Sequence, residues 1–222
     1  MLISIFTGIA AGSIHVVTGA DHLVSMAPLA LRHPKSALKN GLLWGFGHSA
    51  GVLVLSSFAI VLKDWAQLER MSTLAEFGVG IALLVVGVLT IRTAFGLNIH
   101  THNHIHNGGE LHDHIHLHFR GKHKHSSHKH ALTTMGLLHG FAGTSHLLAV
   151  IPALALPTFG AVGYMFAYLL GSILTMCACL VAFSVASSHA GRKLFPTLFA
   201  STGVLSVVTG IFWLQKNFIH II

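Results

Sequence analysis

Two histidines and an aspartate interrupt an almost uncharged apolar stretch near the start of the chain, as His15, Asp21 and His22. Ionisable side chains are costly inside a membrane, so their presence in such a stretch marks a functional site by default. The arrangement returns 124 residues later. Five of the fourteen positions in 15–28 are identical in 139–152, including both histidines and the final proline. We interpret these two segments as the paired centre of the molecule and the remaining chain as scaffold around them.

The composition indicates an integral membrane protein. Of the 222 residues, 53% are hydrophobic and only 9% are charged, whereas soluble domains carry about 25% charged residues. The first apolar stretch lacks a small-residue cleavage site, so we expect it to be a retained helix and not a signal peptide. The net charge of +7 lies mostly outside the apolar stretches. These positive residues therefore indicate the topology of the chain and do not form a nucleic-acid-binding face. We expect the lipid bilayer to surround the protein.

Six stretches are long enough to cross a membrane, since a span needs about 20 mainly apolar residues. The first is too long for one straight span, and we expect it to break at Gly19 and line a protein cavity there. The six expected spans are Leu2–Leu31, Ala37–Leu62, Leu74–Phe95, Ala131–Leu156, Ala161–Ala186 and Phe195–Phe218.

The repeat extends over all six spans. Trp44 and Gly47 in the second span correspond to Tyr168 and Gly171 in the fifth, again 124 residues apart. Three spans per unit force the second unit into the opposite orientation, which is the inverted-repeat plan of many transporters. The predicted fold is an all-α integral membrane protein of six transmembrane helices in two inverted three-helix repeats. The alternative is a coincidence of small-residue spacing for helix packing. The expected division is 1–96 for the first repeat, 97–130 for a histidine-rich cytoplasmic loop and 131–222 for the second repeat.

The positively charged residues predict the orientation. Ten Lys and Arg residues adjoin the first, third and fifth loops, against three at the other loops and the C-terminal tail. Positive residues collect on the cytoplasmic side of a membrane. We therefore expect a multi-pass protein of the inner or plasma membrane with both termini extracytoplasmic.

Twelve histidines crowd the third loop between His100 and His130. Few large apolar residues accompany them, so we expect a disordered tract. Neutral imidazole binds nickel, cobalt, copper and zinc ions, which predicts that the tract captures metal. The alternatives are an expression tag, which would lie at a terminus, and a pH sensor.

Six side chains at membrane depth form the predicted metal site: His15, Asp21, His22, His48, His139 and His146. On a straight helix His15 and His22 lie nearly on one face, whereas Asp21 needs a break at Gly19 to turn toward them. A set rich in imidazole suits a borderline divalent metal better than a hard ion, which prefers oxygen ligands. The alternative is that each histidine makes a hydrogen bond between helices. Glu76 is expected to be a solvated interfacial residue, and the methionines of the spans are expected to pack.

Two of these motifs resemble a known family. The segment from His15 to His22 is similar to the histidine–aspartate–histidine signature of the nickel/cobalt transporter family, which includes urease-associated permeases. Gly47-His48-Ser49 resembles the Gly-His-Ser motif of that family. The resemblance implies transport of nickel or cobalt, with His15, Asp21, His22 and His48 as metal contacts. It also implies no cofactor beyond the transported ion, and a cytoplasmic metallochaperone such as a urease accessory protein as partner.

The predicted function is therefore transmembrane transport of divalent transition-metal ions, nickel or cobalt first, with zinc or manganese as alternatives. A second alternative is a transmembrane thiol-disulfide carrier, whose membrane domains have a similar plan. That chemistry needs one cysteine in each repeat, whereas Cys177 and Cys179 both lie in the fifth span. An enzyme is not expected, because the sequence has no His-Glu-x-x-His motif and Glu76 is the one glutamate within a span.

Overall fold

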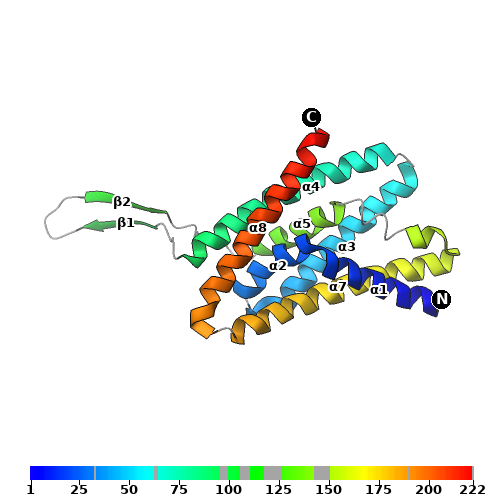
Figure 1. Ribbon diagram of the computed structural model, residues 1–222, viewed down its shortest axis with the longest axis horizontal. Helices are drawn as coiled ribbons and strands as arrows, with labels where there is room; N and C mark the ends of the chain where they lie inside the picture. The colour runs from blue at the N-terminus through cyan, green and yellow to red at the C-terminus, as the bar shows by residue number, and fades with distance from the viewer. Residues whose placement is uncertain are drawn as a thin grey trace.

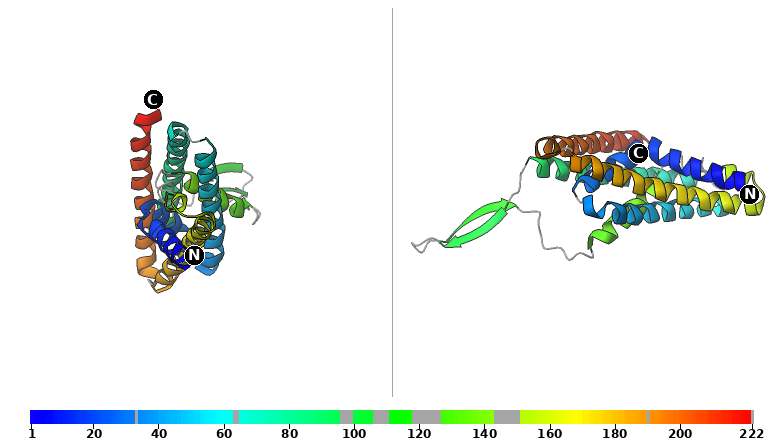
Figure 2. Two further views of the ribbon diagram at one scale, coloured as in Figure 1. Left: turned by 90° about the vertical axis from the view of Figure 1, so that its right-hand side faces the viewer. Right: turned by 90° about the horizontal axis from the view of Figure 1, so that it is seen from below.

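In the computed structural model, the protein is an elongated bundle of apolar α-helices that lie side by side (Figure 1). Two further views show the same bundle (Figure 2). The structure describes residues 1–32, 34–62, 65–95, 100–105, 111–117, 127–142, 151–189 and 191–221. In chain order the elements are α1 (Leu2–Thr18), α2 (Ala20–Arg32), a 3-10 turn (Pro34–Ser36), α3 (Ala37–Leu62), α4 (Trp65–Ala94), β1 (His100–Ile105), β2 (Leu111–Leu117), α5 (Ser127–Phe141), α7 (Thr158–His189) and α8 (Gly191–Ile221).

Four helices of the described chain are long and apolar enough to cross a membrane, over residues 37–58, 67–94, 158–186 and 196–218. The pair α1 and α2 passes the same test jointly but is bent by 72° at its junction. Large apolar side chains such as Phe46, Val85 and Phe166 lie exposed on the outside of the bundle. An apolar outer face of this extent suits contact with lipid and not with water. The fold is therefore that of a helical, membrane-associated protein.

The six predicted spans are confirmed in part. The bounds of α3 coincide with the predicted second span, and α7 and α8 contain the predicted fifth and sixth. The predicted fourth span differs, because α5 ends at Phe141 and residues 143–150 lie outside the described part of the chain. The described residues thus provide four spans, or five if the bent pair is one span, in place of six.

Gly19 breaks the first apolar stretch, as predicted. Its N–H donates to the carbonyl oxygen of His15 at 3.0 Å, and its own carbonyl accepts from the N–H of His22 at 3.0 Å. The backbone hydrogen bonds are therefore kept through the bend, as a buried chain requires. A Cβ at position 19 would overlap the ring of His22. Glycine is needed here because no side chain fits between the two helix ends.

Helix α1 packs along α7, and α3 packs along α5, at contacts between glycine and backbone. A Cβ at Gly12 would overlap the carbonyl oxygen of Tyr168, and a Cβ at Gly136 would overlap the carbonyl oxygen of Trp44. Helices in lipid gain little from burying apolar side chains, so close backbone approach at small residues is what holds them together. The two helices of each pair run parallel, because the residue numbers of the contacting positions increase together along both helices.

Helices α4 and α8 form a third close pair, and they run antiparallel. A Cβ at Gly80 would meet the carbonyl oxygen of Gly210 at 3.1 Å, and a Cβ at Gly87 would meet that of Gly203 at 2.7 Å. From the other side of the first crossing, a Cβ at Gly210 would meet the carbonyl oxygen of Gly80 at 2.8 Å, so each crossing includes a contact under 3.0 Å, which is too short for a Cβ. The pair therefore depends on glycine at both crossings.

A buried apolar cluster fills the space between α2, the start of α3 and the middle of α7. Met26 and Met176 are fully buried in it, and Met135 packs against it. These contacts confirm that the three methionines pack in the apolar interior. The buried members of this cluster are Val16, Met26, Ala30, Ala37, Trp44, Met176 and Leu180.

The histidine-rich loop differs from the predicted disordered tract. Within it, β1 and β2 pair as an antiparallel hairpin, in which His102 lies opposite His114 and His104 opposite His112. Histidine recurs at every second position in both strands. That spacing matches the two-residue period of a strand, in which alternate residues share a face.

We predict that Gly12→Ala destabilises the protein by about 1–3 kcal/mol, the usual cost of overpacking. The added methyl group meets the backbone of α7, which cannot rotate away. Thermal unfolding in detergent, followed by circular dichroism, measures the effect. Gly163→Ala is the matched control, because its Cβ would meet only one side-chain atom, at 3.9 Å. Equal melting temperatures for the two variants would contradict the proposed packing.

Candidate metal centre

Three histidines from three helices converge where α1 meets α2. His15 ends α1, His22 opens α2 and His48 lies in the middle of α3. Their ring centroids are 5.0 Å apart for His15 and His22, 5.6 Å for His15 and His48, and 5.0 Å for His22 and His48. One nitrogen from each ring lies within 4.8 Å of the other two. The break at Gly19 contributes to this convergence, because it turns α2 by 72° from the direction of α1.

Asp21 and His139 adjoin the three histidines. The Asp21 carboxylate lies 3.3 Å from Nδ1 of His22 and 3.6 Å from Nε2 of His139. His139 comes from α5, and its ring centroid is 5.4 Å from that of His22. Asp21 also occupies the first turn of α2, where the positive end of the helix dipole stabilises a negative charge. The cluster therefore joins four helices around one carboxylate.

Burial sets the electrostatics of this cluster. His48 and His139 are fully buried and His22 is 2% exposed, whereas His15 and Asp21 are only partly buried. Away from water a charge interacts more strongly with its neighbours and is costlier to leave uncompensated. One carboxylate among several imidazoles consequently favours a positive charge in their midst.

Two aromatic rings border the histidines. The ring of Trp44 lies 5.2 Å from that of His139, and the ring of Tyr168 lies 6.0 Å from that of His15. Sequence reasoning identified Trp44 and Tyr168 as matching positions of the repeat but not as walls of the site. Their position one helical turn from His48 and Ser172 was the signal that could have placed them there.

The donor set fits a borderline transition metal. Three neutral imidazoles with an adjacent carboxylate are ligands of the kind that hold zinc and related ions in tetrahedral sites. A site with three histidine ligands leaves a fourth position for water or for a carboxylate such as Asp21. Calcium or magnesium would require a shell of oxygen ligands in place of these rings.

The structure brings five of the six predicted site residues together: His15, Asp21, His22, His48 and His139. The sixth, His146, lies outside the described residues. The contact between His22 and His139 agrees with the expectation that histidines of the two repeats face each other.

Glu76 differs from its prediction as a solvated interfacial residue. It is 5% exposed, and its carboxylate accepts a hydrogen bond from Nζ of Lys216 at 3.1 Å. Sequence reasoning missed the pair because Lys216 comes from α8, far along the chain. Lys216 also lies 4.9 Å from the ring centroid of Trp213, which adds a cation–π contact.

Comparisons with known proteins find relatives that are not named as nickel/cobalt transporters. No family model matches the chain, and no solved structure matches it. The chain is 31% identical over 178 residues to the Arabidopsis thaliana protein named Chloroplast protein FOR GROWTH AND FERTILITY 2, covering 79% of this chain and 45% of that protein. It is 28% identical over 177 residues to Chloroplast protein FOR GROWTH AND FERTILITY 1 of the same plant, covering 79% of this chain and 48% of that protein. The chain thus spans about half the length of the curated relatives it matches.

These relatives correct the predicted family and the predicted function. Membership of the nickel/cobalt transporter family is wrong, because the matched proteins carry no such name and no family model supports it. The predicted transport of nickel, cobalt or another divalent metal is wrong for the same reason, and the urease-associated partner loses its basis. The plasma membrane has no support from relatives named as chloroplast proteins. The physical reason is that short histidine and aspartate motifs specify the chemistry of a site, whereas the activity depends on the whole protein around it.

The thiol-disulfide alternative fails with the same correction. Cys177 is buried and Cys179 is partly buried, and both are free thiols on the single helix α7. The α-carbon and sulfur of Cys177 lie where α7 approaches Gly41 of α3. Cys177 therefore has a packing position between α7 and α3.

We predict that Lys216→Met destabilises the protein by about 1–3 kcal/mol, the cost of removing the partner of a buried polar group. The Glu76 carboxylate would stay buried while its cation is lost. Thermal unfolding in detergent measures the change. Lys39→Met is the matched control, because Lys39 is exposed. Restoration of stability in the double variant Glu76→Gln, Lys216→Met would identify the buried charge as the cause, and its failure would refute it.

Proposed function

We propose that this chain is a membrane protein that holds one divalent transition-metal ion inside its helical bundle. His15, His22 and His48 are the ligands, and Asp21 supplies the compensating charge. Nε2 of His139 lies beside Oδ2 of Asp21 and orients the Asp21 carboxylate. The proposal concerns a bound ion and assigns it no movement across the membrane.

The observation that carries the proposal is the convergence of three ring nitrogens within 4.8 Å of one another. Metal–imidazole bonds are about 2.0–2.1 Å long, so two ligand nitrogens of one tetrahedral ion lie a little over 3 Å apart. Rotation of the rings about their side-chain bonds is enough to close the remaining gap. The helices that carry His15 and His48 are already fixed, because α1 and α3 are each held against α7 at glycine contacts.

We further propose that the scaffold is the inverted repeat of two three-helix units. Contacts at matching positions support it. Gly12 meets Tyr168 as Gly136 meets Trp44, and all four positions obey the same offset of 124 residues. The parallel pair α1 and α7 runs opposite to the parallel pair α3 and α5 (Figure 1), as an inverted arrangement demands.

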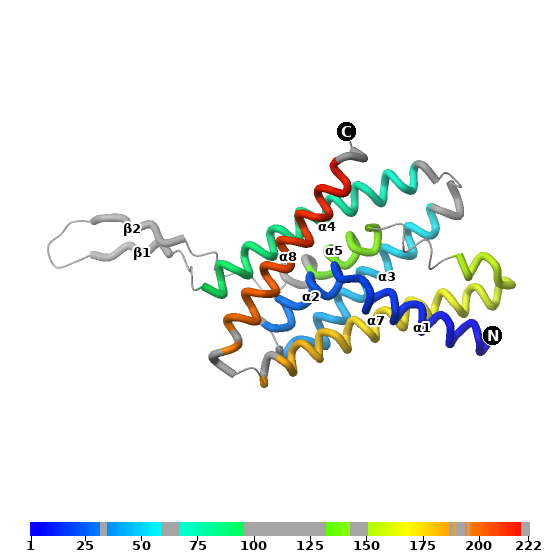
Figure 3. Tube along the Cα trace, in the orientation of Figure 1, coloured from blue at the N-terminus to red at the C-terminus, as the bar shows by residue number. Residues whose placement is uncertain are grey.

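We also propose that both termini lie on the face of the membrane opposite to the basic loops. Figure 1 supports this sidedness, because α2, α4 and α7 all end toward the side from which the β1–β2 hairpin projects. The N-terminal end of α1 and the start of α7 lie at the other end of the bundle (Figure 3). Most Lys and Arg residues lie in the loops on the side of the hairpin. By the positive-inside rule, that side is the one that is not translocated across the membrane.

A binding role is proposed and not an enzymatic one. A metal-dependent hydrolase needs a general base beside the ion in addition to the ligands. Glu76, buried within a described span, is engaged by Lys216 at the interface of α4 and α8. Asp21 is engaged by two imidazoles. Glu69 lies within the span 67–94 as well, but it is exposed on the outside of the bundle. The buried and partly buried carboxylates of the described helices are thus committed to ion pairs.

We predict that the purified protein binds one Zn²⁺ ion at this cluster, and that His22→Ala or His48→Ala weakens the binding by more than the 10–100-fold typical of an outer-shell loss. The twelve histidines of 100–130 would bind ions of their own, so the full-length chain is used with these histidines replaced by asparagine. Equilibrium dialysis with elemental analysis gives the stoichiometry. X-ray absorption at the zinc edge should show imidazole ligands at about 2.0–2.1 Å.

The matched control for this experiment is His189→Ala. His189 is exposed at the end of α7 and its Nδ1 lies 2.8 Å from the carbonyl oxygen of Val185. Its removal should leave the affinity unchanged. Zinc binding that survives His22→Ala and His48→Ala together would refute the proposed centre.

We predict that cysteines at Lys35 and Thr158 are labelled from opposite sides of oriented vesicles by a membrane-impermeant maleimide. Both residues are exposed, and they lie at opposite ends of the bundle according to the direction of the helices. Cys177 and Cys179 are first replaced by alanine to remove the native thiols. Labelling of both positions from one side would contradict the proposed sidedness.

A further inference from the structure

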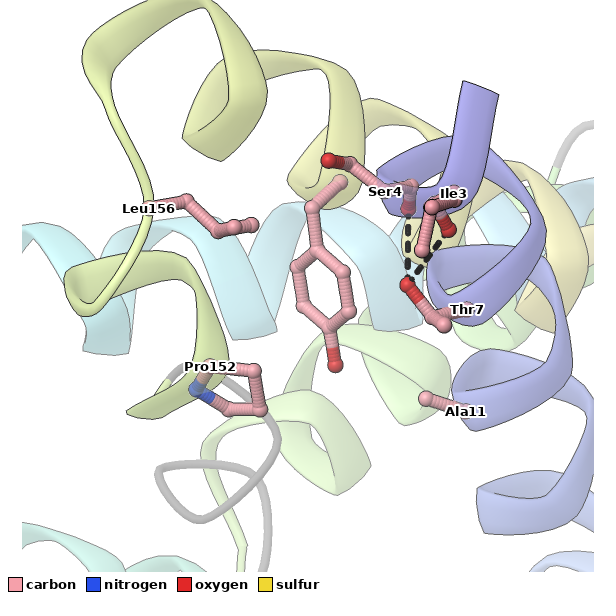
Figure 4. A pocket seen from close by; sticks show the side chains of 7 residues that line it. Ile3, Ser4, Thr7, Ala11, Pro152 and Leu156 are labelled. Atoms are coloured by element: carbon pink, nitrogen blue, oxygen red, sulfur yellow. Dashed lines mark hydrogen bonds between the residues drawn. The ribbon is translucent and has the colours of Figure 1, made fainter. Parts of the chain in front are cut away.

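A cavity of about 420 Å³ lies between the N-terminal half of α1, the segment at 152–156 and the start of α7 (Figure 4). It is far larger than the roughly 30 Å³ that one water molecule takes up in the liquid. Figure 4 shows Ser4, Thr7 and Ala11 of α1 on one side of it and Pro152 and Leu156 on the other. The lining residues are Ile3, Ser4, Thr7, Ala11, Pro152, Leu156 and Tyr164.

The wall of the cavity formed by α1 lies on the helix face that also carries His15. Ser4, Thr7, Ala11 and His15 follow one another at intervals of three or four residues, so they share one face of the helix. The opposite wall continues in the same way, because Tyr168 follows Tyr164 after one turn of α7 and lies 6.0 Å from the ring of His15. His15 is also the histidine of the three that remains partly exposed.

The matching space at the other end of the bundle is filled. With the offset of 124 residues, Ala11 corresponds to Met135, Tyr164 to Asn40 and Pro152 to Pro28. Met135 packs against the buried apolar cluster, Pro28 is buried and Asn40 is 8% exposed. Space is therefore left beside this face of α1 at one end of the bundle, whereas packed side chains occupy the matching positions at the other end.

We propose that this cavity is the entrance through which a hydrated divalent cation reaches His15 from the side of the N terminus. The inference rests on the proposed metal centre and names its access route. Ser4 and Thr7 line the entrance, and Figure 4 shows the Thr7 hydroxyl hydrogen bonded to the carbonyl oxygens of Ile3 and Ser4. Their uncharged oxygen atoms can contact the water shell of an ion without trapping it. His15 then replaces the first water molecules before His22 and His48 complete the site.

The test fills the cavity and follows the rate of metal loading. Ala11→Trp places an indole in the space between the two walls, whereas Ile14→Trp places the same bulk on the exposed side of α1, where Ile14 is 61% exposed. The full-length protein lacking the loop histidines is mixed with Co²⁺ in detergent, and the visible absorption of the bound ion is followed by stopped flow. We expect Ala11→Trp to slow loading by about tenfold or more, since an added barrier of about 1.4 kcal/mol suffices. Ile14→Trp should load at the wild-type rate.

The final spectrum distinguishes the route from the site. An unchanged final spectrum and stoichiometry with slow loading supports the entrance. Loading of Ala11→Trp at the wild-type rate overturns the entrance and leaves the metal centre intact. Loss of equilibrium binding in a folded Ala11→Trp protein also overturns it, because the substitution would then act on the site. Absence of Co²⁺ binding in the parent protein would refute the metal centre itself.

A reversible block provides an independent measurement. Thr7→Cys is prepared with Cys177 and Cys179 replaced by alanine, and the new thiol is modified by a methanethiosulfonate reagent that carries a bulky cation. Modification should slow Co²⁺ loading by about tenfold or more by the same barrier argument, and reduction with dithiothreitol should restore the rate. The parent protein treated in the same way is the control. A modified protein that loads at the unmodified rate contradicts the route.

Discussion

The close approach of helix backbones at glycine is the constraint on which the rest of this structure depends. Gly12 and Gly136 allow α1 onto α7 and α5 onto α3, with no room for even a methyl group. Because lipid is as apolar as the side chains it surrounds, burial of leucine or valine cannot drive this association as it would in water. Backbone contact and dispersion must do so. The same contacts bring α3, with His48, against the helix that carries His139.

The buried histidines follow from this packing and place a demand on it. A helix bundle can bury imidazoles cheaply because they are neutral near physiological pH, whereas each buried carboxylate requires compensation. Asp21 meets that requirement through His22, His139 and the N-terminal end of α2. Glu76 meets it through Lys216. The two carboxylates are therefore satisfied in different ways, and only Asp21 lies where several imidazoles could also surround a cation.

Sequence periodicity and composition predicted most of the apolar helices, the break at Gly19 and five of the converging side chains, because each of these depends on local chemistry. A helix in lipid can be recognised in the sequence by its length and its apolar composition. An aspartate beside two histidines is easily identified within such a segment. The Glu76–Lys216 pair could not be predicted, since it depends on how α4 and α8 cross. The family assignment failed for a related reason. A short motif such as Gly47-His48-Ser49 fixes a backbone contact and a ligand, and neither of these determines the activity of the whole protein.

The two halves use equivalent positions for different purposes, and this difference places the site. His48 of α3 corresponds to Ser172 of α7 under the offset of 124 residues. The hydroxyl of Ser172 donates to the carbonyl oxygen of Tyr168 at 2.9 Å and lies 3.3 Å from that of Gly12. It therefore completes the contact between α1 and α7 and leaves no ligand there. At the equivalent crossing of α5 and α3, Gly136 meets the backbone of His48, so the imidazole is free to extend toward His15 and His22. If the proposed repeat were symmetric in its candidate ligands it would offer two equal sites, whereas the change from histidine to serine concentrates these residues in the first half.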